Sequence, residues 1–175
     1  MLVIKVDKVT GHRSTFSSPS IGDGPVLQRA KAVCISDQNE SIYILDDLLD
    51  SVIAVSLVNA DRTLISSEER GSGPSLEGAR DISFDVNRGK LIVSSTVQDG
   101  ILQVDLHTGS RTLVAGVGLG EGPPLPNITH LNYNPNEDEL FGYEKSNSSL
   151  LSIDIETGSR FELDRFEWCE PTDVV

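Results

Sequence analysis

The sequence predicts an all-β fold assembled from repeated units of four strands, and three observations carry this prediction. The tetrapeptide Gly-x-Gly-Pro occurs three times, beginning at Gly22, Gly71 and Gly120, with 49 residues from one copy to the next (71 − 22 and 120 − 71). A strand–turn–strand phrase recurs with the same period. No segment keeps the apolar period of a helix over several turns. A fixed period of this length is the signature of a repeat architecture.

The recurring phrase is clearest at residues 102–114, which read Leu-Gln-Val-Asp-Leu-His-Thr-Gly-Ser-Arg-Thr-Leu-Val. It aligns without a gap with residues 53–65 and 151–163, and a shorter copy spans residues 4–13. Every copy has an arginine at the same place, and these arginines are Arg13, Arg62, Arg111 and Arg160. The unbroken register indicates four copies of one structural unit.

One unit reads as four short strands separated by turns. Residues 79–85 alternate polar and apolar side chains, which is typical of a half-buried strand. The segments between the strands are rich in Asn, Asp and Gly, which tolerate the positive φ that tight hairpins need. The expected strands are residues 79–85, 90–96, 101–106 and 111–115.

Four antiparallel strands in a repeat of about 40–50 residues correspond to one blade of a β-propeller. Residues 89–93, 101–106 and 109–114 resemble repeats of the six-bladed TolB-like superfamily, which includes the NHL, YWTD and SMP-30/gluconolactonase-like propellers. The phrase is most similar to NHL and YWTD repeats. The resemblance covers nearly the whole chain, and it implies a periplasmic or secreted location. It implies no single function, because propellers include binding modules and enzymes.

We expect one domain, a partial propeller that begins and ends inside a blade. Residues 1–21 supply the third and fourth strands of a split blade, and residues 169–175 resemble the start of another first strand. Three whole units lie between them, at residues 22–70, 71–119 and 120–168. A closed propeller typically has about four to eight blades. Three hypotheses fit this count: a fragment of a larger propeller protein, self-association that completes the propeller, or a compact four-bladed ring.

The composition is acidic, with a formal net charge of −13 over 175 residues. Such a surface repels a phosphate backbone, so the sequence predicts no nucleic-acid partner. No apolar run approaches the ~20 residues that a membrane-spanning helix needs, and no signal peptide is visible at Met1. The expected partner is therefore a protein or a small-molecule ligand.

The candidate ligand-binding residues lie where the copies of the repeat differ. A group that recurs from blade to blade is expected to be structural, such as the Arg of the repeated phrase and its Asp, which Ser56 replaces in one copy. A ligand face is instead expected from the loops that enter the first strands and from the loops that join second to third strands, and the first strands line the axis. The candidate ligand-binding residues are Lys31, Arg80, Asp81, His130, Asn132 and Glu144.

An acidic segment gives a second candidate, a metal site. Asp46, Asp47 and Asp50 supply three carboxylates at the connection between a second and a third strand. Clusters of oxygen ligands suit Ca²⁺, although the spacing is not that of an EF-hand. Acidic turns without a metal are the alternative. The sequence shows no other cofactor signal.

The sequence favours a non-catalytic binding module that recognises a protein or small ligand through its top-face loops. It contains no Gly-x-Ser-x-Gly elbow, His-Glu-x-x-His or Cys-x-x-Cys motif, and no catalytic residue is assigned. The alternative is a metal-assisted hydrolase of the SMP-30/lactonase type, which the resemblance suggests. In that alternative, Asp81, Asn132 and Glu144 are the candidate axial ligands.

Overall fold

The computed structural model describes residues 1–166, and this part of the chain consists of β-strands and turns without a helix. The predicted start of a further first strand, at residues 169–175, lies outside the described residues. The first sheet has two antiparallel strands, β1 (Val3–Val6) and β2 (Arg13–Ser17), and we call it the half blade. Three four-stranded antiparallel sheets follow, and we call them blades one, two and three.

The strands of each blade follow one another in the sequence and in the sheet. Blade one contains β3 (Ala30–Ser36), β4 (Ser41–Asp46), β5 (Ser51–Ser56) and β6 (Arg62–Ser66). Blade two contains β7 (Ala79–Asp85), β8 (Lys90–Ser95), β9 (Gly100–Asp105) and β10 (Arg111–Ala115). Blade three contains β11 (Ile128–Asn134), β12 (Glu139–Glu144), β13 (Ser149–Ile153) and β14 (Arg160–Arg165). The bounds predicted for blade two differ from these by at most one residue.

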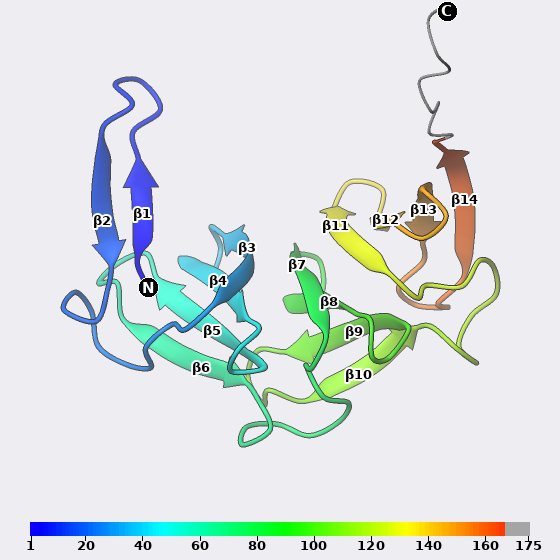
Figure 1. The fold of residues 1–175 in the computed structure, drawn as a ribbon, viewed down its shortest axis with the longest axis horizontal. Coiled ribbons are helices and arrows are strands. Elements are labelled where there is room, and N and C mark those ends of the chain that lie inside the picture. Colours follow the sequence, from blue (N-terminus) through cyan, green and yellow to red (C-terminus); the bar gives the residue numbers. More distant parts are fainter. Residues whose placement is uncertain (167–175) are drawn as a thin grey trace, which may run out of the picture.

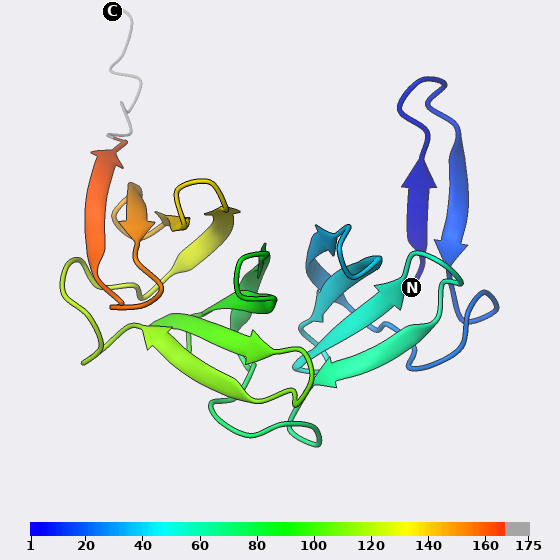
Figure 2. The same ribbon diagram turned by 180° about the vertical axis from the view of Figure 1, so that it is seen from behind.

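The blades stand side by side along an arc, with the half blade at one end and β14 at the other (Figure 1). The first strands β3, β7 and β11 lie on the concave side of the arc, and β6 and β10 lie on its outer side, as the view from behind in Figure 2 also shows. The all-β propeller arrangement predicted from the repeat is confirmed. None of the described residues belongs to a helix that could cross a membrane.

Three apolar cores lie between successive blades, because a four-stranded sheet cannot bury both faces alone. The core between the half blade and blade one contains Leu27, Ile53 and Val55, with Phe16 against it. The other two cores join blade one to blade two and blade two to blade three. Each core contains the leucine that follows a Gly-x-Gly-Pro segment, and these leucines are Leu27, Leu76 and Leu125.

The aspartates of the repeated phrase cap the turn between the third and fourth strands. The carboxylate of Asp105 accepts hydrogen bonds from the backbone N–H groups of His107 and Thr108, at 3.0 and 2.8 Å. Asp7 and Asp154 bind their own turns in the same way. These bonds lower the pKa of all three carboxyl groups. Their interpretation as structural groups is confirmed.

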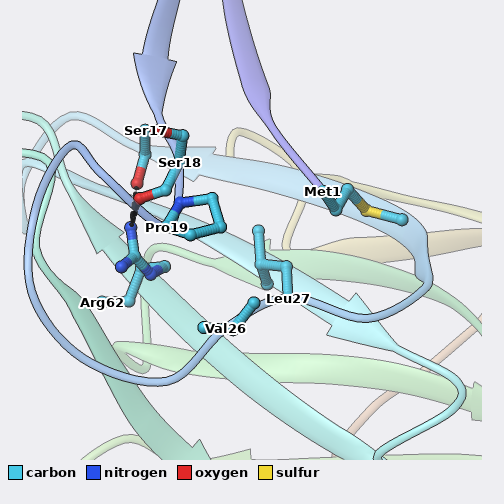
Figure 3. A pocket seen from close by; sticks show the side chains of 7 residues that line it. All are labelled: Met1, Ser17, Ser18, Pro19, Val26, Leu27 and Arg62. Atoms are coloured by element: carbon cyan, nitrogen blue, oxygen red, sulfur yellow. Dashed lines mark hydrogen bonds between the residues drawn. The ribbon is translucent and has the colours of Figure 1, made fainter.

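The arginines of the repeated phrase bind the Gly-x-Gly-Pro segments, and we call each such pair an arginine clasp. In clasp one, Arg62 donates from Nε to the carbonyl oxygen of Pro25 at 2.7 Å and from Nη2 to that of Gly22 at 2.9 Å. Its Nη1 reaches back to Ser17 and Ser18 at the end of β2, as Figure 3 shows. One side chain thus joins the end of one blade, the crossing segment and the outer strand of the next blade.

Clasps two and three repeat this geometry. Arg111 binds the segment Gly71–Pro74, and Arg160 binds the segment Gly120–Pro123. In all three clasps the backbone N–H of the arginine donates to the carbonyl oxygen of the variable residue in Gly-x-Gly-Pro, at 2.6–2.7 Å. The guanidinium groups are buried, and the three arginines are only 5–6% exposed.

The glycines of a clasp are required by close approach as well as by backbone conformation. A Cβ on Gly71 would lie 2.0 Å from the carbonyl oxygen of Gly109, and one on Gly73 would lie 1.9 Å from that of Arg111. Both glycines also have positive φ. The sequence predicted these glycines as turn formers at the crossings between blades. The structure adds that they lie in close contact with the backbone of the blade that the segment enters.

Candidate ligand-binding pocket

A pocket of about 420 Å³ lies on the concave side of the arc, at the first strands of the three blades. Lys31 and Ala32 come from β3, Arg80 and Asp81 from β7, and Thr129 and His130 from β11. These are the same two repeat positions in each blade, so the pocket forms where the copies meet at the axis. Lys145, which follows β12, completes the lining.

The pocket is cationic although the chain as a whole is strongly acidic. Lys31, Arg80 and Lys145 are exposed, and each presents a positive charge there. The Nζ of Lys31 lies 3.9 Å from the carboxylate of Asp47. The side chains of Arg80 and Lys145 form no hydrogen bond or ion pair within residues 1–166. Two unpaired cations therefore face the same space.

The one carboxylate that lines the pocket, that of Asp81, accepts hydrogen bonds from two backbone N–H groups. One of its oxygens accepts from the N–H of Ile82 at 2.9 Å, and the other accepts from the N–H of Leu131 at 2.7 Å. The second bond crosses from β7 to β11. Asp81 therefore links two blades at the pocket, where its single carboxylate lies beside three cationic side chains.

His130 lies at the edge of the pocket as an exposed side chain. Its Nδ1 is 3.0 Å from the hydroxyl of Thr129, and its ring centroid is 6.2 Å from that of Tyr143. The imidazole can donate or accept a hydrogen bond toward a ligand through its other nitrogen.

The structure brings four of the six predicted binding residues together, namely Lys31, Arg80, Asp81 and His130. Asn132 lies farther along β11, exposed, and does not line the pocket. Glu144 is buried, and its carboxylate accepts from the N–H groups of Ser146 and Asn147 at 3.1 and 2.7 Å. Glu144 caps the turn after β12 in place of lining the pocket.

Sequence reasoning missed Lys145 as a lining residue. It stands in the turn after β12, where its backbone N–H donates to the carbonyl oxygen of Asn127 at 3.0 Å. That bond pins the turn against the loop that enters β11. A basic residue directly after a second strand is the sequence signal that could have pointed to it.

The acidic segment after β4 is held by local hydrogen bonds. The buried carboxylate of Asp46 accepts from the N–H groups of Gln28 and Arg29 and from two in its own turn. Asp47 pairs with the guanidinium of Arg29, and Asp50 has a positive φ in the turn. Within residues 1–166, no three His, Cys, Asp or Glu side chains gather in a way that could hold a metal ion. Calcium binding stays a prediction without an assembled ligand set.

Comparison with known proteins finds similarity in structure. No protein-family model matches the chain, and no curated protein matches its sequence. A nidogen/laminin complex contains a chain with a TM-score of 0.68 and 15% identity, matched over 93% of this chain and 57% of that one. A streptogramin B lyase gives a TM-score of 0.63 and 15% identity, over 92% and 47%. An auxiliary nutrient binding protein from Bacteroides ovatus gives a TM-score of 0.64 and 14% identity, matched over 93% of this chain and 36% of that one.

The chain thus spans between about a third and three fifths of the length of these structures. At such low identity the likeness concerns the fold alone. The blades, their order and the crossings between them are those of YWTD- and NHL-like propeller domains. The described residues form a half blade and three whole blades with the fold of a β-propeller.

Proposed function

We propose that the chain is a non-catalytic binding module whose axial pocket takes a small anionic ligand. The observation that carries this proposal is the pair of unpaired cations, Arg80 and Lys145, that face one pocket in a chain of net charge −13. Elsewhere an acidic surface would repel an anion, so the pocket is a local exception. A guanidinium recognises a carboxylate or phosphate through paired hydrogen bonds.

The size of the pocket supports a small ligand. A volume of about 420 Å³ lies within the usual range of ligand sites. The pocket residues differ between blades at equivalent repeat positions, as expected for residues that provide specificity. The structural neighbours include a nutrient binding protein and a lyase, so the fold is compatible with small-molecule recognition. The exported location that the resemblance implies remains part of the proposal.

The hydrolase alternative has weaker support in the described residues. It needs carboxylates that are free to bind a metal near the axis, whereas those of Asp81 and Glu144 accept backbone hydrogen bonds. We therefore propose binding without catalysis as the function to be tested first.

The experiment is calorimetric titration of the full chain at low ionic strength with citrate, inorganic phosphate and, as a neutral probe, glucose. We expect citrate or phosphate to bind and glucose not to bind. Arg80→Gln and Lys145→Gln should each weaken the affinity for the anion about tenfold, since a hydrogen bond to a charged group contributes about 1.5–3 kcal/mol. The matched control is Lys90→Gln, because Lys90 bonds Gln103 outside the pocket. Absence of anion binding, or equal affinity in all three variants, would overturn the proposal.

A further inference from the structure

A second pocket, of about 310 Å³, lies on blade one, and we call it the outer pocket. Its apolar lining consists of Pro25 from the crossing segment, Leu49, Ile53 from β5 and Leu64 from β6. The outer pocket shares no lining residue with the axial pocket, and β6 lies on the outer side of the arc (Figure 1). Its volume is within the usual range of ligand sites. The two pockets are therefore separate sites.

Ser51 adds a buried hydroxyl without a partner to the outer pocket. The residue is 1% exposed, and its Oγ forms no hydrogen bond with any of residues 1–166. Alternate side chains of a strand point to the same face, so Ser51 points to the face of Ile53, which lines the pocket. Buried hydroxyl groups in folded proteins are nearly always paired, because an unpaired one is costly. A ligand in the outer pocket would supply the missing partner.

The equivalent position in the other two blades has no unpaired hydroxyl. In blade three it is Ser149, whose Oγ donates to the carboxylate of Glu162 at 2.9 Å. Glu162 stands two repeats beyond Leu64, so blade one has a leucine where blade three has the acceptor. In blade two the equivalent of Ser51 is Gly100. Among the three blades, blade one alone combines the serine with a side chain that cannot pair with it.

The outer pocket is open because of the shape of the repeat. Its lining residues lie between Pro25 and Glu69, in blade one and the segments that enter and leave it. Blade two stands between two whole blades, and its equivalent residues Pro74 and Leu113 are half-buried, as Pro25 and Leu64 are. The same part of each blade is therefore reached by solvent.

Two carboxylates border the outer pocket. Glu68 and Glu69 lie in the middle of the turn that leaves β6, which is closed by two backbone hydrogen bonds of 3.0 and 3.3 Å. Neither carboxylate forms a hydrogen bond or an ion pair within residues 1–166. The turn that leaves β10 has the same pair of backbone bonds, with Val117 and Gly118 at these places. The acidic pair is thus another difference between the copies.

The cation of the same turn binds outside the pocket. The guanidinium of Arg70 donates to the carbonyl oxygens of Leu64 and His107, and His107 belongs to blade two. Arg70 does not line the outer pocket. The charge at the pocket is therefore that of the two glutamates.

The hydroxyl and the carboxylates lie at the same end of blade one. Ser51 is the first residue of β5, and its neighbour Val52 lies opposite Ser66, the last residue of β6. The acidic turn begins directly after Ser66. One polar group of a ligand is therefore placed to bind the hydroxyl of Ser51 and to face both carboxylates.

We propose that the outer pocket binds an apolar amine, a small molecule with a hydrocarbon chain or ring and one ammonium group. The hydrocarbon would lie against Leu49, Ile53 and Leu64. The ammonium group would donate to the Oγ of Ser51 and would be attracted by the carboxylates of the acidic turn. This site takes a ligand of the opposite charge to that proposed for the axial pocket, and it does not depend on that proposal.

The test is calorimetric titration of the full chain at low ionic strength with 2-phenylethylamine and with 2-phenylethanol, which has the same ring but no charge. We expect the amine to bind at one site and the alcohol to bind about tenfold more weakly, because hydrogen bonds to an ionised group are stronger. Added salt should weaken the affinity for the amine, because it screens exposed carboxylates. Absence of saturable amine binding, or equal affinity for the amine and the alcohol, would overturn the proposal.

Variants of the protein locate the binding. Ser51→Ala should weaken the affinity for the amine about tenfold and should not lower Tm, since it deletes a hydroxyl that has no partner. Glu68→Gln combined with Glu69→Gln should also weaken the affinity and should remove most of its salt dependence. The matched control is Glu77→Gln, an exposed glutamate in the next crossing segment. Unchanged affinity in Ser51→Ala, or in the double glutamine variant, would refute the site. Arg80→Gln should leave amine binding intact, which separates this test from that of the axial pocket.

Discussion

The Nε of Arg62 donates a 2.7 Å hydrogen bond to the carbonyl oxygen of Pro25, across 37 residues of chain. The same bond joins Arg111 to Pro74 and Arg160 to Pro123. Each of the three Gly-x-Gly-Pro segments is therefore bound by the arginine of the blade that it enters. Each clasp links the outermost strand of a blade to the segment by which the chain enters that blade. The apolar cores bury the sheet faces, and the clasps fix how one blade follows the next.

The first prediction concerns the clasp arginine. Arg111→Ala removes a buried guanidinium that binds the carbonyl oxygens of Ser67, Arg70 and Pro74. Buried oxygens without a donor cost about 1–3 kcal/mol each, so we expect the free energy of unfolding to fall by about 3 kcal/mol or more. Urea unfolding measures this change. Arg13→Ala is the matched control, and it should change stability by less than about 0.5 kcal/mol. Similar losses in both variants would contradict the role of the clasp.

The second prediction concerns the clasp glycines. Gly73→Ala places a Cβ 1.9 Å from the carbonyl oxygen of Arg111 at a φ of +107°, so the crossing segment must move away from β10. Gly89→Ala meets nothing within 4 Å, and its cost is the left-handed backbone alone, about 1–2 kcal/mol. We expect Gly73→Ala to lower Tm clearly more than Gly89→Ala does. Equal shifts in thermal unfolding would show that close approach does not matter at this position.

Repetition is what made much of the fold predictable from the sequence. Strand bounds in blade two followed from alternation and turn residues, and the structural role of Asp105 followed from its recurrence. The partner of Arg111 could not be predicted, because the bond to Pro74 depends on how a blade closes on its own entry segment. The repeat period alone says that the arginine is structural and does not say what it binds.

The residues of the pocket could likewise be predicted only in part from the repeat. Lys31, Arg80 and His130 were found because the alignment of first strands places them at the axis. Glu144 was misleading because its position repeats Asp46 and Ser95, and all three cap the turn after a second strand. That recurrence, at a spacing of 49, was present in the sequence and indicated a structural carboxylate. Lys145 occupies the position that Asp47 and Thr96 hold in the other two blades, and the backbone N–H of all three residues donates to the loop that enters the first strand. The path of this turn therefore repeats, and the basic side chain at this position is the signal that sequence reasoning missed.

The third prediction concerns stability in acid. Arg88 in blade two holds the carboxylate of Asp138 in blade three at 2.6 and 2.8 Å, and the hydroxyl of Tyr133 donates to the same carboxylate. These partners hold the pKa of Asp138 well below its ordinary value of 3.8. A carboxyl group with a lowered folded-state pKa stabilises the fold above its unfolded pKa and loses that contribution as the pH falls through the folded-state pKa.

We therefore expect stability to decline below about pH 4, and we expect Asp138→Asn to weaken that decline. Urea unfolding at a series of pH values from neutral to acid measures the effect. Asp37→Asn is the control, because Asp37 is an exposed turn residue whose side chain has no partner within residues 1–166. Parallel pH profiles for the wild type and Asp138→Asn would contradict the prediction.

The fourth prediction concerns the thiol of Cys34. The side chain packs against the core between blades one and two, and burial, with a further contribution from the Asp81 carboxylate, raises its pKa to about 12. The thiolate is the reactive form, so at pH 8 the folded protein should present very little of it. In a Cys169→Ser background, which leaves Cys34 as the one cysteine in the sequence, we expect reaction with a disulfide reagent to be more than about 100-fold slower than in urea. A native rate at pH 8 equal to the unfolded rate would mean that blades one and two separate readily at this core, because a packed thiol beside a carboxylate cannot ionise so easily.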